Sequence, residues 1–232
     1  MKKYILISVM VLAICGMFAT NYQLSGYSGT TKRVPQKQGL FFQSVLGIDF
    51  SGEHEVEWDE AKVSYDVSTG ISPSIEMLKQ NNQFIYGLGL EYQLPREVDA
   101  SFEGGKPKFG FLPLYLIGKY KLPFQMNFET EGVLHLGYNA FMHDKKYADD
   151  EEYYVNSNDY GSYEYDSSGG LYWGLGVSAL FQQRFVVQLM YKLNNASMDV
   201  HWSEYYYGDW DEESYSFDIS NSQLQLGLGI RF

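Results

Sequence analysis

Hydrophobic and polar residues alternate strictly over the last twelve residues of the chain. The apolar positions are Leu224, Leu226, Leu228, Ile230 and Phe232. Between them lie Gln223, Gln225, Gly227, Gly229 and Arg231. Because successive side chains of a strand point to opposite faces, this pattern predicts a strand with one apolar face and one polar or empty face.

The same alternation recurs in seven earlier segments, at about 40–50, 61–77, 86–94, 109–122, 124–139, 171–181 and 185–194. Their connections alternate in length, with tight turns at residues such as 80–82, 123 and 182–184, and long polar segments at 53–60, 95–108, 142–170 and 197–215. An antiparallel barrel with both chain ends on the periplasmic side has this order of short turns and long external loops. The pattern therefore predicts an all-β fold, an eight-stranded antiparallel transmembrane up-and-down β-barrel. A soluble lipocalin-like barrel is the alternative, with the apolar face turned inward.

Composition supports strands over helices, since the chain has 21 Tyr, 15 Phe and 23 Gly but 6 Pro. After residue 20, no segment stays apolar for the roughly 18 residues that a membrane helix needs. A helical membrane protein is therefore excluded for the mature chain.

The N-terminal segment differs from the rest. Lys2 and Lys3 precede an almost wholly apolar run from Tyr4 to Phe18, and the small residues Ala19 and Thr20 follow, which predicts a signal peptide over residues 1–19. A retained anchor and lipidation at Cys15 are the alternatives. Residues 20–39 are expected to form a polar extension, and residues 40–232 the barrel. Cleavage would leave a cysteine-free protein, as suits an oxidising periplasm.

The chain is acidic, with a net charge of −12, which becomes −14 once Lys2 and Lys3 are removed with the signal. This charge disfavours nucleic acid as a partner, because the nucleic-acid backbone is bound by cationic surfaces.

The strand pattern, the Gly-x-Gly alternations (such as Gly87 with Gly89) and the terminal Phe232 resemble the small outer-membrane β-barrel family that includes OmpA-type membrane domains and OmpX/Ail-like and OmpW-like proteins. The resemblance covers about residues 40–232. It implies a location in the bacterial outer membrane, in contact with lipopolysaccharide. It also implies that the barrel-assembly machinery reads Phe232 as an assembly signal. A monomer is expected.

Charged residues on the polar faces predict a charge network in the lumen, made of Glu76, Glu91, Lys119, Lys121, Glu129, Glu131, Lys192 and Arg231, with Asp49 and Asp66 on the same faces. Unpaired burial of charge is costly, so these side chains should be paired or hydrated. Glu129 and Glu131 are expected to pair with Lys119 and Lys121, and His135 to be a hydrogen-bonded interior residue. A closed polar lumen is expected, with a narrow conduit as the alternative.

The long loops carry the remaining candidates. His201 and Ser203 are spaced as in a His-x-Ser pair, but the residues that follow differ from those of lipid A deacylases. Acidic runs at 149–152 and 209–213 lack the spacing of a calcium loop. The loops are also rich in Tyr and Trp, which suit an interfacial girdle or a recognition surface. We therefore expect a structural or surface-interaction (adhesion-like) protein that is not an enzyme and has no cofactor or metal, with host or neighbouring surface molecules as partners. A small transporter and, more remotely, a lipid A-modifying enzyme are the alternatives.

Overall fold

A computed structural model describes residues 39–50, 52–58, 61–99, 108–124, 126–143, 153–156, 159–206 and 209–232. These residues belong to one compact unit, Lys37–Phe232. The predicted signal peptide and nearly all of the polar extension lie outside the described residues and stay predictions. No helix among the described residues is long and apolar enough to cross a membrane.

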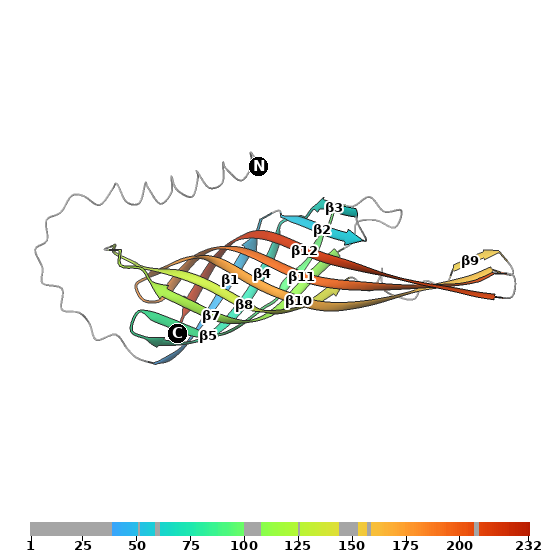
Figure 1. Cartoon of the computed structure of the whole chain (residues 1–232). Helices are drawn as coiled ribbons and strands as arrows, with labels where there is room; N and C mark the ends of the chain where they lie inside the picture. The colour runs from blue at the N-terminus through green and yellow to red at the C-terminus, as the bar shows by residue number, and fades with distance from the viewer. Residues whose placement is uncertain are drawn as a thin grey trace, which may run out of the picture. The chain divides into compact units, whose positions relative to one another are not determined.

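Most of the described residues form strands (Figure 1). They are β1 (Leu40–Asp49), β2 (Glu53–Trp58), β3 (Ala61–Asp66), β4 (Gly70–Asn81), β5 (Phe84–Glu91), β6 (Gln93–Glu97), β7 (Lys108–Lys121), β8 (Glu129–His143), β9 (Tyr153–Asn156), β10 (Asp159–Phe181), β11 (Phe185–Tyr206) and β12 (Asp209–Arg231).

Eight of these strands make a closed ring in the order β1-β4-β5-β7-β8-β10-β11-β12. The last strand pairs with the first, from Gln43 opposite Arg231 to Asp49 opposite Gln225, and every pairing around the ring is antiparallel. The predicted eight-stranded antiparallel barrel is therefore confirmed. Ring closure leaves no open sheet edge at this level, which a sheet surrounded by lipid requires.

Three ring strands continue beyond the ring after an interruption. β2 follows β1 along the same edge of β12, β3 leads into β4, and β6 continues β5 against β7. At the joint between β1 and β2, a Cβ on Gly52 would lie 1.9 Å from the carbonyl oxygen of Ser222, so the close approach of the two strands requires glycine there. The acidic stretch 53–60, expected to be a loop, instead contains β2, which forms a hairpin with β3.

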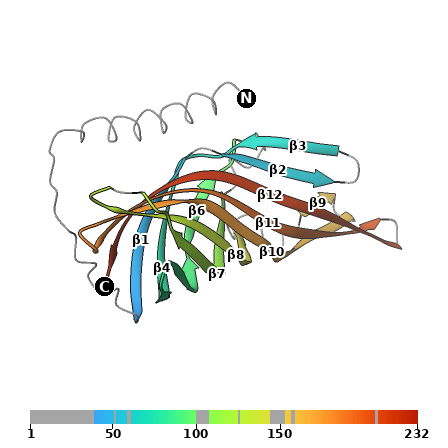
Figure 2. The ribbon, with the colours of Figure 1, turned by 60° about the vertical axis from the view of Figure 1, so that its left-hand side comes forward.

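The long loops expected at 142–170 and 197–215 are also largely strand. Beyond the ring, residues 160–169, 196–205 and 210–219 continue β10, β11 and β12 as a three-stranded sheet, here called the ribbon (Figures 1 and 2). Ten residues per strand extend about 30 Å. Strict apolar–polar alternation is not needed where water wets both faces, so the sequence pattern hid these strands. Cross-strand side-chain hydrogen bonds support them instead, such as Ser168 Oγ to Ser197 Oγ at 2.6 Å.

Around the ring, large apolar side chains point outward and are exposed. Leu88, Leu116 and Leu136 stand side by side on β5, β7 and β8, and each is about half exposed. Similar side chains follow every ring strand, including Leu46, Ile75, Leu134, Leu175, Val187 and Leu228. We call this outward apolar surface the belt. A contiguous exposed apolar surface of this extent suits lipid contact, and the buried charges lie inside. The soluble lipocalin-like alternative is therefore wrong.

Replacement of Leu116 by Arg should lower the free energy of unfolding by about 2–4 kcal/mol, because the cation would enter the hydrocarbon near the middle of the belt. The measurement is urea-induced unfolding in phospholipid vesicles. Val63→Arg is the matched control, because Val63 is also an exposed strand residue but lies in the β2–β3 hairpin, outside the belt. Equal losses in the two variants would contradict a lipid-facing belt.

Candidate functional site

The inward face of the ring collects the charged residues that the alternation singles out. Glu76 of β4, Glu91 of β5, Lys119 of β7, Glu131 of β8 and Lys192 of β11 are all buried. Each sits at an inward position because its two neighbours along the strand point out to the belt or its rim.

The pair of Lys192 and Glu91 crosses the whole bore. Lys192 Nζ donates a hydrogen bond to Glu91 Oε2, and the two strands that carry them stand on opposite sides of the eight-stranded ring. One step toward the outer end of the strands, Gln93 and Asn194 exchange amide hydrogen bonds across the same gap. Direct side-chain bonds therefore join opposite walls of the ring at this level.

A second pair joins Lys119 to Glu76, with Lys119 Nζ 2.7 Å from Glu76 Oε2. It reaches past β5, which lies between their strands and presents Gly89 on its inner face. A Cβ on Gly89 would lie 2.4 Å from Tyr115 Cε2, so glycine here makes room for the Tyr115 ring. The Gly-x-Gly pattern of β5 thus provides space for large side chains from the facing strands.

Arg231 forms the third pair, near the end of the ring where the chain terminates. Its guanidinium donates to both carboxylate oxygens of Glu131, at 3.0 and 2.9 Å, and also to Gln43 Oε1. Ser178 donates to the same carboxylate at 3.0 Å. The expected pairing of Glu131 with a lysine is therefore wrong. A bidentate arginine holds the carboxylate better than a lysine ammonium does. Glu129 does pair with Lys121, at 2.5 Å.

Aromatic rings fill the space between these pairs. Tyr115 stacks on His135 with centroids 4.3 Å apart and contacts Tyr172 at 5.2 Å. His135 Nδ1 lies 3.3 Å from the Tyr172 hydroxyl, and His135 Nε2 lies 3.9 Å from Glu76 Oε1. His135 is therefore an interior residue within hydrogen-bond reach of a tyrosine.

A polar group of side chains and an apolar cluster lie at the outer end of the bore. Asp49 accepts hydrogen bonds from Ser72 and Gln225, and Arg96 donates to Asn221 and Gln223. Above them lie the apolar side chains of Phe109, Phe111, Phe141, Ala196 and Ile219. We call this outer end of the ring the mouth.

Sequence reasoning missed several interior residues. Gln43, Asn194 and Gln225 are buried at inward positions of their strands. The apolar–polar alternation predicts that they face inward but does not predict their hydrogen-bond partners. Arg96 was missed because it fell in a segment expected to be loop. Asp66, expected in the lumen, is exposed on the β2–β3 hairpin because β3 lies beyond the ring.

Opposite charges balance inside the described part of the ring. Five cations, Lys119, Lys121, Lys192, Arg231 and Arg96, face five carboxylates, Glu76, Glu91, Glu129, Glu131 and Asp49. The interior is thus neutral as a whole, although the protein carries a net charge of −12. The surplus of acids is therefore carried elsewhere on the chain.

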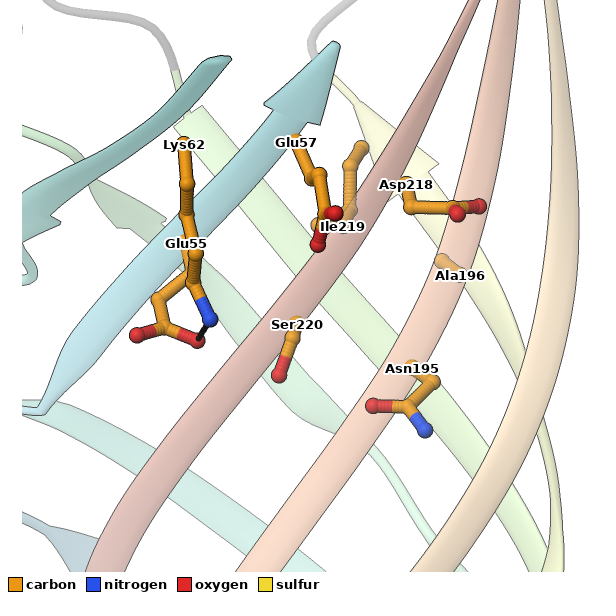
Figure 3. A pocket seen from close by; sticks show the side chains of 8 residues that line it. All are labelled: Glu55, Glu57, Lys62, Asn195, Ala196, Asp218, Ile219 and Ser220. Atoms are coloured by element: carbon orange, nitrogen blue, oxygen red, sulfur yellow. Dashed lines mark ion pairs between the residues drawn. The ribbon is translucent and has the colours of Figure 1, made fainter. Parts of the chain in front are cut away.

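A pocket of about 350 Å³ lies beyond the ring, where β2 and β3 adjoin β11 and β12 (Figure 3). Lys62 Nζ lies 2.8 Å from Glu55 Oε2, and this hydrogen bond raises the pKa of Lys62 above its ordinary value. Glu57 stands opposite Asp218 in the strand ladder, an unfavourable pairing of like charges. The remaining lining residues are Asn195, Ala196, Ile219 and Ser220.

The candidate His201 lies on the ribbon. His201, the histidine of the remote His-x-Ser alternative, has its Nδ1 2.8 Å from Ser214 Oγ on the neighbouring strand. The acidic run 149–152 lies outside the described residues, as does Tyr207. The side chains of residues 153–156, 159–165, 167, 202, 204–206 and 209–211 are likewise not described. In the part of the chain that the structure describes, no group of three His, Cys, Asp or Glu side chains is placed to hold a metal ion.

Comparisons with known proteins identify the fold. No protein-family model matches the sequence, and no curated protein sequence matches it. The structure is similar to that of the outer membrane protein AlkL, solved in lipid bilayers, with 14% identity over 90% of this chain and 97% of AlkL, and a TM-score of 0.50. OprG of Pseudomonas aeruginosa is 16% identical over 84% of this chain and 97% of its own, with a TM-score of 0.48. Ail of Yersinia pestis, in complex with the heparin analogue sucrose octasulfate, is 16% identical over 82% and 99%, with a TM-score of 0.40. The chain has the fold of small bacterial outer-membrane β-barrels.

The assembly role of Phe232, which is exposed at the end of β12, stays a prediction.

Replacement of Lys119 by Met should lower the free energy of unfolding by about 3 kcal/mol, because Glu76 would keep a buried charge without its cation. The double variant Lys119→Met/Glu76→Gln should recover at least half of that loss, since it removes both charges. Urea unfolding of both variants and of Glu76→Gln completes a double-mutant cycle. Strictly additive losses would show that the two residues do not act as a pair.

Proposed function

We propose that the protein is a non-conducting outer-membrane barrel that displays the ribbon outside the cell as a binding surface. The observation that carries this proposal is the direct bonding across the bore, above all between Lys192 and Glu91 on opposite strands. The role is therefore adhesion-like or structural, and no enzymatic step is assigned to it.

The interior supports a closed barrel. An eight-stranded ring is just wide enough for its own side chains to fill. Here those side chains are salt-bridged, hydrogen-bonded and stacked from the Arg231–Glu131 pair at one end to the apolar cluster at the mouth. A transporter of apolar molecules would need a continuous apolar path, whereas ion pairs and amides cross the bore beside its buried cluster of Leu78, Ile85, Tyr115, Ile117 and Tyr172.

The ribbon supports a binding surface. Short turns, such as the one at Gln182–Arg184, lie at one end of the ring, and the ribbon leaves the other end. In outer-membrane barrels the end with long segments is external. Asp166, Glu212, Glu213 and Asp218 are exposed on it. A paired three-stranded sheet is stiffer than a loop, so partner contacts there cost less conformational entropy. The acids favour partner surfaces that carry positive charge.

The purified protein should give no stable ion-conducting steps in a planar lipid bilayer, because the bore is bridged by Lys192–Glu91 and filled by aromatic rings. Single-channel recording at neutral pH measures this, and a general diffusion porin in the same bilayer serves as the positive control. Regular openings by the intact protein would contradict the closed bore and favour the transporter alternative.

Shortening the ribbon should reduce attachment while leaving the barrel folded. Deleting four residues from each strand, 162–165, 200–203 and 212–215, removes three matched segments and keeps the alternation of faces. Cells of a laboratory Gram-negative strain that display either form are compared for attachment to cultured host cells and to extracellular-matrix proteins.

Heat-modifiable migration in SDS gels provides the control that both forms fold and reach the membrane in equal amounts. Several-fold weaker attachment of the shortened form is the expected result. Equal attachment by cells with the shortened protein, the full-length protein or no protein would overturn the binding role. That result would leave the closed bore untouched, since conductance tests it separately.

A further inference from the structure

The β2–β3 hairpin lies beside the mouth and is held by β12 along one strand and by hydrogen bonds at its base. β2 pairs with β12 over five residues, from Glu53 opposite Ser222 to Glu57 opposite Asp218 (Figure 2). At its base, Val67 forms an isolated bridge to Val98, the Ser68 N–H donates to the Glu97 carbonyl at 3.0 Å, and the Asp99 N–H donates to the Asp66 carbonyl at 2.8 Å. Non-strand residues, Gly52 on one side and Ser68 and Thr69 on the other, join the hairpin to the ring strands. Because β1 closes the ring on β12 by its own pairing, release of the hairpin would break these bonds and leave the ring closed.

His54 is the side chain by which the hairpin enters the mouth. It is 1% exposed and stacks on Phe109 of β7, with centroids 5.0 Å apart and planes within 9°. Phe109 also packs against the cluster of Val67 and Val98 that the hairpin covers. Nε2 of His54 is buried and has no hydrogen-bond partner among the described residues. The imidazole thus packs here as a flat, uncharged ring.

The charges around His54 oppose its protonation. Arg96 of β6 is the charged group that acts on it, and it is buried in the mouth. Opposite His54 in the strand ladders stand uncharged residues, Asn221 of β12 and Tyr65 of β3. Its own-strand neighbours Glu53 and Glu55 alternate to the other face of β2.

Farther in, the nearest carboxylates are already engaged. Asp49 of β1 accepts from Ser72 and Gln225, and Glu91 of β5 accepts from Lys192. Because interior cations and carboxylates are balanced with His54 neutral, a proton on His54 would add an uncompensated charge beside Arg96. Burial of such a charge is costly.

We propose that the β2–β3 hairpin is an acid-released lid on the mouth, with His54 as its latch. In the closed state, neutral His54 packs on Phe109 and the hairpin shields Val98. On acidification, His54 takes up a proton and leaves the mouth for water, and the hairpin swings out at its two joints. Opening uncovers the apolar cluster of Val67, Val98 and Phe109, while the bonds across the bore below stay in place. The lid is thus a property of the external end and does not depend on the proposed binding role.

The direction of the effect follows from the titration of His54. Burial, and then the charge of Arg96, lower the pKa of His54 from 6.5 to about 4 in the closed state. In the open state, with the ring in water, the pKa returns toward 6.5. The closed state is therefore favoured fully above about pH 6.5 and loses that advantage as the pH falls toward about 4. The closed-to-open equilibrium should fall by up to roughly 300-fold across this range.

The test measures how often the position of Val98 becomes accessible. Val98, 2% exposed under the hairpin, is changed by Val98→Cys in a Cys15→Ser background, which removes the one native cysteine. Labelling by a dithiodipyridine, which reacts with thiols at acid pH, is followed in detergent micelles from about pH 7.5 to about pH 4, the range that spans the titration of His54. Division by the rate of a free peptide thiol at the same pH gives the protection of the introduced thiol.

Protection of that thiol should fall by roughly one hundred-fold or more over this pH range in the protein that keeps His54. Protection should change less than about threefold in His54→Phe, which keeps an aromatic ring stacked on Phe109. The variant His54→Gln should behave in the same way and serves as the test if His54→Phe does not fold. His201→Phe, a change at the exposed histidine of the ribbon, should behave like the parent. Constant protection in the parent, or an equal fall in the His54 variants, would overturn the proposal and, in the second case, point to another group such as His135.

Discussion

The ion pairs across the bore are the constraint on which the rest of the structure depends. Closing eight strands into a ring whose outer face is apolar forces the polar residues inward, where water is scarce. Each interior charge must then find an opposite charge, because an unpaired one would cost several kcal/mol. Lys192 meets this need with Glu91 on the opposite wall, and Arg231 with Glu131. The same bonds that pair the interior charges also cross the bore, so charge pairing and the proposed closure of the bore have one cause.

Apolar side chains face outward and large polar and aromatic side chains face inward, and this arrangement explains where glycine occurs. Inside the ring, large residues from one strand need empty positions on another. Gly89 provides such a position under the Tyr115 ring. Tyr115 in turn stacks on His135, so the empty position on β5 determines the packing two strands away. The small-residue alternation is thus a packing requirement of a narrow barrel filled by aromatic and charged side chains.

The sequence alone predicts the ring well and the bonding inside it poorly. Alternation identifies which residues face inward, because a strand has only two faces; this holds for Glu76, Lys119 and Arg231. It cannot identify partners, since these depend on how far around the ring a side chain reaches. Glu131 shows the difference: lysines on the adjacent strand were expected, but the bond is to Arg231, three strands away. Long-range closure of β1 on β12 brings these two ends of the chain together.

The segments beyond the ring were predicted least well, for a related physical reason. Alternation is strong where lipid contacts one face and weak where water reaches both. The ribbon and the β2–β3 hairpin therefore read as loops, and Arg96 and His54 were not recognised as interior residues of the mouth. Ladder hydrogen bonds and cross-strand pairs such as Asp199 with Ser216 hold these parts instead of lipid contact.

The ring and the segments beyond it are therefore stabilised by different interactions. Between the turns and the mouth, loss of one ion pair leaves a charge in a dry interior, so the structure there tolerates little movement. Beyond the mouth, backbone pairing and modest apolar clusters can be broken at lower cost, and local opening need not disturb the ring. His54 lies where these two regions meet: its backbone belongs to the β2–β3 hairpin, and its side chain is buried in the mouth. A single proton at that position acts on both regions at once, which a titratable group deep in the bore or far out on the ribbon would not do.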